Sequence, residues 1–173
     1  MTARTLKFAI FGNSYQSKKS VAIESIIRCL NNYGAYISID SEYYHFLVEE
    51  QKVKVEVNKV FRGDDFDSDF VISMGGDGTF LKSVSRVGEK SIPIIGVKMG
   101  RLGFLADVSP NDFRCCLESL YSGEYTVENR TFRLWGATAV SENTFVPGTI
   151  IGPPLDKEYA VLPVGVLMTS PSA

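Results

Sequence analysis

The sequence is poor in the residues that build metal centres and disulfide frameworks. It contains one histidine and one tryptophan, and its three cysteines are odd in number and lack metal-ligand spacing. His45 has no second histidine or cysteine near it in sequence, so we predict a packing or surface role for it. Cys115 and Cys116 lie in a helical pattern and are expected to be small core residues rather than a redox pair. No metal site of protein ligands is predicted.

Long apolar runs and blocks of positive charge are also missing. No run approaches the roughly 20 apolar residues that span a bilayer, and Met1–Lys7 lacks the apolar core of a signal peptide. The net charge is -2 and no basic run occurs, which argues against nucleic acid as a partner. We therefore expect a cytoplasmic protein that does not bind membranes, and any anionic ligand must be held by local geometry.

The pattern of apolar residues predicts alternating strands and helices. Short buried strands are expected at residues 6–11, 35–39, 69–74 and 92–97, with a helix after each of them. Gly34 should end the first helix, Ser41 should cap a short second one, and Ser109-Pro110-Asn111-Asp112 should open the last. Val53, Val55 and Val57 alternate with charged residues and predict an edge strand. This alternation is typical of an α/β fold with a doubly wound, Rossmann-like parallel sheet.

The composition changes near residue 130. Helical periodicity ends there, and the following 43 residues hold five of the seven prolines: Pro147, Pro153, Pro154, Pro163 and Pro171. We therefore expect an α/β nucleotide-binding kinase domain at residues 1–129. Residues 130–173 are expected to form a short β-rich tail.

Gly75-Gly76-Asp77-Gly78-Thr79 follows a predicted buried strand and opens a helix. Three glycines in four positions let the backbone approach a bulky ligand closely. The unpaired amides and the dipole of a helix N-terminus favour an anion such as phosphate, and open α/β sheets bind ligands at this edge. A carboxylate at Asp77 would repel phosphate, which suggests a magnesium-linked role or a base that accepts a proton from a hydroxyl. The alternative is a helix cap with nothing bound.

A second glycine-rich block, Gly96–Leu105, follows the next predicted strand. Its glycines at 96, 100 and 103 do not match the G-x-G-x-x-G dinucleotide fingerprint. They leave open backbone beside Arg101, which could pair with phosphate, and Phe104, which could lie against a base. The alternative is a loop with Phe104 in the core. No Walker A, H-R-D or D-F-G string occurs, which excludes P-loop kinases and gives no support to a protein kinase.

The two blocks together resemble the NAD kinase family, bacterial type. GGDGT is shared with diacylglycerol and sphingosine kinases, whereas a following GVKMGRLGFL block is particular to NAD kinases. The opening FAIFGNSYQSKK and the run ISMGGDGTFLKSVSRVG are also similar to that family, and the resemblance covers residues 6 to 129. It implies transfer of the γ-phosphoryl group of ATP, or of inorganic polyphosphate, to the 2′-hydroxyl of the adenosine ribose of NAD, which makes NADP. A divalent cation, expected to be Mg²⁺, and homo-oligomeric assembly are implied as well.

The resemblance also implies roles for single residues. Asp77 would be the proton acceptor, Gly78 would contact NAD, and Lys82 would lie near the dinucleotide. Phe104 would pack near the adenine, and Asn13 would approach the nucleotide triphosphate. The complete set of expected site residues is Asn13, Gly75, Gly76, Asp77, Gly78, Thr79, Lys82, Arg101, Gly103 and Phe104.

Two features depart from the family pattern. Lys98 stands where the second block usually carries asparagine, and the tail lacks the asparagine–glutamate pair and the T-G-S-T string of the family's second, largely β domain. We therefore expect residues 130–173 to replace that domain. The alternatives to an active NAD kinase are a truncated copy or a non-catalytic nucleotide-binding module. A lipid kinase of the diacylglycerol or sphingosine type would share GGDGT but not the GRLGFL string.

Overall fold

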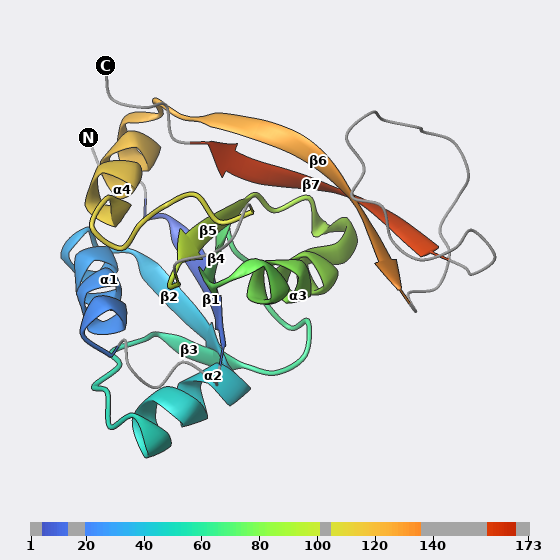
Figure 1. Ribbon diagram of the computed structural model, residues 1–173. Helices are drawn as coiled ribbons and strands as arrows, with labels where there is room; N and C mark the ends of the chain where they lie inside the picture. Colours follow the sequence, from blue (N-terminus) through green and yellow to red (C-terminus); the bar gives the residue numbers. More distant parts are fainter. Residues whose placement is uncertain (1–4, 14–19, 101–104, 136–158, 169–173) are drawn as a thin grey trace.

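A seven-stranded sheet forms the centre of the molecule (Figure 1). The computed structural model describes residues 5–13, 20–100, 105–135 and 159–168, with the backbone alone at 129–135 and 159–168. The strand order is β3-β2-β1-β4-β5-β7-β6, and the first five strands are parallel. The expected α/β fold with a parallel sheet is confirmed.

The parallel strands are short, and all but the edge strand at residues 59–61 are largely buried, as parallel strands covered by helices usually are. They are β1 (Lys7–Gly12), β2 (Tyr36–Asp40), β3 (Lys59–Phe61), β4 (Phe70–Gly75) and β5 (Ile94–Lys98). All six residues of β4 are buried, which suits its position as the central strand of the seven-stranded sheet. Antiparallel β6 (Thr126–Trp135) and β7 (Tyr159–Met168) extend the sheet, and β7 pairs with β5.

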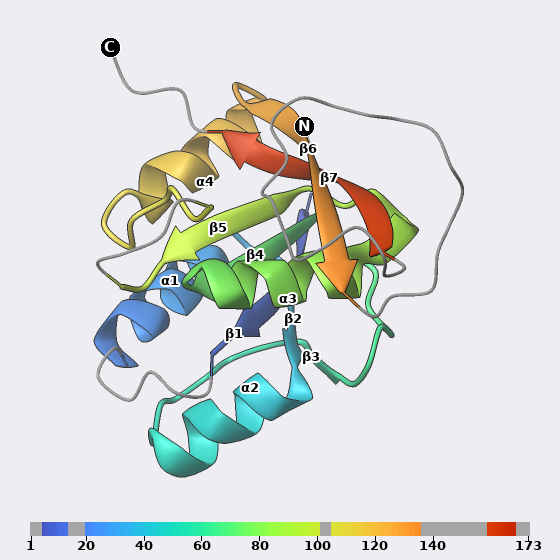
Figure 2. The ribbon, with the colours of Figure 1, turned by 45° about the vertical axis from the view of Figure 1, so that its right-hand side comes forward.

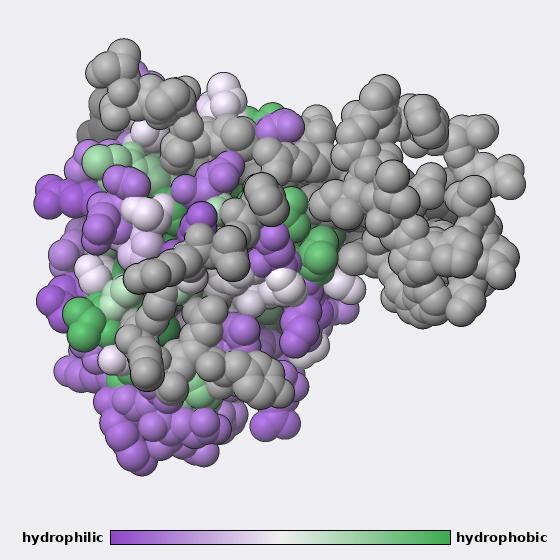
Figure 3. Space-filling view, in the orientation of Figure 1, coloured by the Kyte–Doolittle hydropathy of each residue, from purple (hydrophilic) through white to green (hydrophobic). Residues whose placement is uncertain are grey.

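Helices cover both faces of the sheet (Figure 2). The helices α1 (Ser20–Asn32), α2 (Ser41–His45) and α4 (Phe113–Ser122) pack on one face, and a π-helical turn (Phe46–Glu50) continues α2. The helix α3 (Asp77–Val87) packs on the other face and is followed by a 3₁₀ turn (Gly88–Lys90). In the described part of the chain, no helix is long and apolar enough to cross a bilayer. Figure 3 shows a hydrophilic surface over α2, where Glu42, His45 and Glu49 are exposed.

The predicted strands before the glycine blocks are confirmed to within two residues, but the predicted edge strand is wrong. Residues 53–57 form no strand, and the edge strand β3 begins only at Lys59. Pairing with β2 begins at Asn58, whose backbone amide donates to the Ile37 carbonyl at 2.8 Å. The Val53 amide donates instead to the Leu47 carbonyl at 2.9 Å. The alternation of Val53, Val55 and Val57 therefore reflects packing of this segment against the hydrophobic core on the side of α1 and α2, and not pairing as a strand.

Two predicted helix caps also differ in the structure. Asp40, not Ser41, caps α2, because its carboxylate accepts from the Glu42 and Tyr43 amides at 3.1 and 3.3 Å. The last helix begins at Phe113, with Asp112 as its N-cap residue, one turn after the predicted cap at Ser109. The Ser109 hydroxyl instead accepts from the Asp112 amide at 3.2 Å and lies 2.6 Å from its carboxylate, which closes the preceding turn.

The paired cysteines of α4 separate on folding. Cys116 is buried, as predicted, but Cys115 is exposed, which corrects the expectation that both belong to the core. Successive residues of a helix point about 100° apart, so neighbours cannot both face the sheet. Gly34 and Gly123 follow α1 and α4 with positive φ angles of 65° and 79°, which confirms the predicted glycine stops.

Two glycines permit close approach of neighbouring segments. A Cβ atom on Gly12 would lie 2.0 Å from the ring of Tyr43, so that ring packs directly over the end of β1. A Cβ atom on Gly96 would lie 2.7 Å from the Cα atom of Ala106 and 3.1 Å from the ring of Phe80. The second contact joins β5, α3 and the segment after the second glycine block.

We predict that Gly96→Ala lowers the free energy of unfolding by about 1–3 kcal/mol, because the added methyl group must push against backbone. Urea denaturation measures the change. Gly100→Ala is the matched control, since a Cβ atom there meets nothing within 4 Å. Equal stability of the two variants would contradict the close packing of Ala106 on β5.

The burial of Tyr43 predicts that the protein loses stability at alkaline pH. Burial raises the pKa of its hydroxyl well above its usual value near 10, and the hydroxyl donates to the Met74 sulfur at 3.8 Å. Above pH about 10 the unfolded chain ionises this group while the folded chain does not, which favours unfolding. The stabilising contribution is therefore complete below pH 10 and is lost progressively above it. Urea denaturation between pH 8 and 11 should show a steeper loss in the wild type than in Tyr43→Phe, and parallel curves would contradict the assignment.

Candidate functional site

A cleft of about 550 Å³ opens at the carboxyl ends of β1, β2 and β4. The chain turns to opposite faces of the sheet after β1 and β4, since α1 packs in one core layer and α3 in the other. Ligand sites of open α/β sheets lie at such a point. The ends of the two strands supply Phe11, Gly12 and Asn13 on one side and Gly76 on the other.

The helix α3 forms one wall of the cleft. Gly78, Lys82, Ser85 and Arg86 line it at spacings of three and four residues, so they share one face of the helix. Thr79 also lines the cleft close to the helix N-terminus. Gly76 is the N-cap residue, and it makes no side-chain hydrogen bond to this end of the helix. The first amides of a helix have no partner within the helix, which suits a helix N-terminus to an anion.

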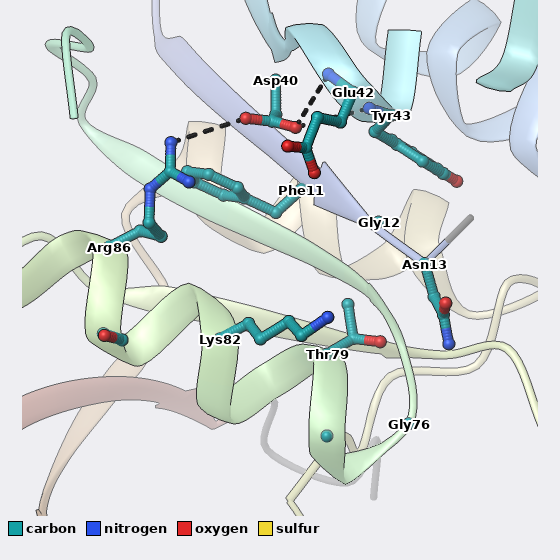
Figure 4. A pocket seen from close by; sticks show the side chains of 12 residues that line it. Phe11, Gly12, Asn13, Asp40, Glu42, Tyr43, Gly76, Thr79, Lys82 and Arg86 are labelled. Atoms are coloured by element: carbon teal, nitrogen blue, oxygen red, sulfur yellow. Dashed lines mark hydrogen bonds and ion pairs between the residues drawn. The ribbon is translucent and has the colours of Figure 1, made fainter. Parts of the chain in front are cut away.

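The beginning of α2 forms the opposite wall, with Asp40, Glu42 and Tyr43 (Figure 4). Tyr43 is buried and its ring lies over Gly12, which fixes α2 against the end of β1. Asp40 follows from the end of β2 and caps α2 with its carboxylate. The wall is therefore positioned by the same parallel sheet that positions the glycine turn.

Arg86 ties the two walls together at one end of the cleft. Its guanidinium lies 3.5 Å from the Asp40 carboxylate and 2.7 Å from that of Asp64 in the loop before β4. It also donates to the Gly63 carbonyl and lies over the Phe11 ring, 5.6 Å from its centroid. Because the Asp40 carboxylate is only 13% exposed, this pair is better shielded from solvent than a surface salt bridge.

Asp77 lies beside the cleft rather than in its lining. Its carboxylate accepts a hydrogen bond from the Leu105 amide at 3.0 Å, so it faces the end of the second glycine block. The Met99 amide donates to the Gly75 carbonyl at 3.2 Å, which gives a second link between the two blocks. Thr79 packs against Gly75, where a Cβ atom would lie 2.3 Å from the Thr79 hydroxyl oxygen.

The structure brings together half of the site residues expected from the sequence. Those that line the cleft are Asn13, Gly76, Gly78, Thr79 and Lys82. Gly75 and Asp77 adjoin it on the side of Leu105. Arg101, Gly103 and Phe104 lie outside the described residues, so their expected contacts with phosphate and base stay predictions.

Sequence reasoning did not identify the α2 wall. Asp40 and Glu42 lie more than 30 residues before the glycine turn, Arg86 lies on a far turn of its helix, and no motif marks them. A usable signal did exist for Asp40, because the carboxyl ends of parallel strands meet at one edge and Asp40 ends the second strand. For metal binding, no three Asp, Glu, His or Cys side chains cluster in the described ranges.

Three comparisons agree with this architecture. Residues 8–125 match the family model of the ATP-NAD kinase N-terminal domain. The NAD kinase of Bacteroides fragilis is 49% identical over 126 residues, which cover 73% of this chain and 43% of that protein. The NAD kinase of Porphyromonas gingivalis is 34% identical over 125 residues, which cover 72% of this chain and 43% of that protein.

One solved structure has a similar fold. The crystal structure of yeast NADH kinase, solved with NADH, superposes with a TM-score of 0.61 at 13% identity. The match covers 94% of this chain and 47% of the yeast one. The chain thus spans less than half the length of these relatives. The family match over most of the chain, on a fold with the glycine turn at its ligand-binding edge, shows that the chain belongs to the NAD kinase family.

Proposed function

We propose that this chain acts as an NAD kinase, which transfers the γ-phosphoryl group of ATP to the 2′-hydroxyl of the adenosine ribose of NAD. One observation supports the proposal most: a single cleft is lined by Asn13, Gly76, Gly78 and Lys82. The chain that forms this cleft matches the family model of the ATP-NAD kinase N-terminal domain. A cytoplasmic location and the division at residue 130 belong to the same proposal. The relatives named NAD kinase support the reaction class.

The cleft suits the phosphates of the donor. The first amides of α3 and the positive end of its dipole face the Gly76 end, where phosphate oxygens can accept hydrogen bonds. Lys82 extends into the cleft from the next turn and adds a positive charge (Figure 4). Asn13, at the end of β1, supplies an amide group on the opposite side. We assign the ATP phosphates to this end of the cleft.

Asp77 suits the acceptor side of the same turn. Its carboxylate faces Leu105, so an acceptor hydroxyl between α3 and the second glycine block could give its proton to Asp77. In this step the bond from the γ-phosphorus to the bridging oxygen of ATP breaks and a bond to the ribose oxygen forms. ADP leaves, and NADP carries the new phosphate. The proposed roles of Arg101 and Phe104 concern this same side.

A divalent cation fits this arrangement when it is held chiefly by the donor. Mg²⁺ commonly binds through substrate phosphates with one or two carboxylates, so it needs no dedicated cage of protein ligands. Asp77 is the carboxylate of the glycine turn that could contribute. The ion would offset negative charge on the phosphates during transfer.

We predict that Asp77→Asn lowers the rate of NADP formation from NAD, ATP and Mg²⁺ by at least about 100-fold, because the amide cannot accept the proton. Enzymatic detection of NADP measures the rate. Asp107→Asn is the control, since Asp107 is exposed and lies two residues beyond Leu105. Equal rates in wild type and Asp77→Asn would contradict the role of Asp77, and binding of ATP without turnover in the wild type would favour a non-catalytic module.

We predict that Lys82→Ala weakens ATP binding by about 10- to 100-fold, because a charged hydrogen bond to phosphate is worth about 1.5–3 kcal/mol. Isothermal titration calorimetry with ATP measures the change, and the effect should shrink as salt rises. Lys54→Ala removes an equally charged side chain that lies outside the cleft and is 87% exposed. An unchanged affinity for ATP in Lys82→Ala would contradict the proposal that the ATP phosphates bind in this cleft.

A further inference from the structure

Charge is distributed unevenly along the cleft. Figure 4 shows Asp40, Glu42 and Arg86 at one end and Asn13, Thr79 and Gly76 at the other, with Lys82 reaching between them. We call the first the acidic end and the second the glycine end. The glycine end offers helix amides and a lysine, which favour phosphate. The acidic end offers carboxylates, which repel it.

The acidic end keeps a net negative charge despite Arg86. That arginine is shared by two carboxylates, Asp40 at 3.5 Å and Asp64 at 2.7 Å. Within the described part of the chain, Glu42 takes part in no ion pair. Its backbone amide is held by Asp40, which fixes where its side chain starts. The Arg86 guanidinium is therefore engaged by Asp40 and Asp64, and the charge of Glu42 is not offset by an ion pair with it.

We propose that this acidic end, through Glu42 above all, selects a nucleoside triphosphate over linear inorganic polyphosphate as the donor. The inference rests on the proposed function, since it assumes that the donor phosphates lie at the glycine end. ATP would place its uncharged ribose and base against Asp40 and Glu42, whose oxygens can accept hydrogen bonds from ribose hydroxyls. A polyphosphate chain carries charge along its whole length, so its continuation would meet these carboxylates.

Three probes separate the two ends of the cleft: ATP, tripolyphosphate and a longer linear polyphosphate. Tripolyphosphate matches the phosphates of ATP and can occupy the glycine end alone. We expect the wild type to bind ATP and tripolyphosphate. The added negative charge of the longer chain would by itself strengthen its attraction to Lys82 and the helix amides, and we expect the measured affinity for the longer chain to be weaker than that. Glu42→Gln keeps the shape of this exposed side chain and should strengthen binding of the longer chain by about threefold or more, as removal of a like charge at close range predicts. Tripolyphosphate affinity should change little.

Glu49→Gln is the matched control, because Glu49 lies on the continuation of the same helix, is exposed and does not line the cleft. It should leave all three affinities unchanged. The proposal is overturned if Glu42→Gln binds the longer polyphosphate no better than the wild type, or if Glu49→Gln strengthens that binding equally. Failure of the proposed function is distinct: the wild type would then bind neither ATP nor tripolyphosphate, or would bind them independently of Lys82.

Discussion

The site depends on one constraint of the backbone, which is that β1 and β4 are neighbours whose chains leave the sheet on opposite faces. The polypeptide after β4 enters α3 on one side, while α1 and α2 lie on the other. No helix can then cover the gap between the two carboxyl ends. The side chains of the cleft are placed by this divergence, including the cleft-facing stripe of α3 and the acidic wall at the start of α2.

Close packing holds the two walls at a fixed separation. The Tyr43 ring occupies the space that a side chain at Gly12 would need, and Arg86 joins α3 to Asp40 across the cleft. Asp40 has two functions in this arrangement, because it caps α2 and pairs with Arg86. Walls fixed in this way need less ordering when a ligand binds between them.

The glycine turn separates two kinds of chemistry. Gly76, Gly78 and Lys82 face the cleft, whereas Asp77 faces Leu105. A carboxylate at the glycine end of the cleft would oppose the proposed binding of phosphate there, and the position of Asp77 beside Leu105 avoids that conflict. The proposed donor and acceptor thus approach the helix N-terminus from different sides, which is the arrangement that an in-line transfer requires.

The sequence by itself determined the α/β class, most strands, and the glycine turn at the end of β4. These features depend on local patterns: apolar runs, helix periodicity and glycines at strand ends. It also indicated Asn13, Gly78 and Lys82, which the structure brings to one cleft. It misplaced the edge strand, since alternation alone cannot show whether a neighbouring strand is in reach.

Only the tertiary structure decided what faces the glycine turn. Asp40 and Glu42 come from a strand end and a short helix more than 30 residues earlier in the chain, and no local pattern relates them to Arg86. The direction of Asp77 was likewise invisible, because a helix start can present its first side chain to either side. These features arise from the order of strands in the sheet, which sets distant residues side by side.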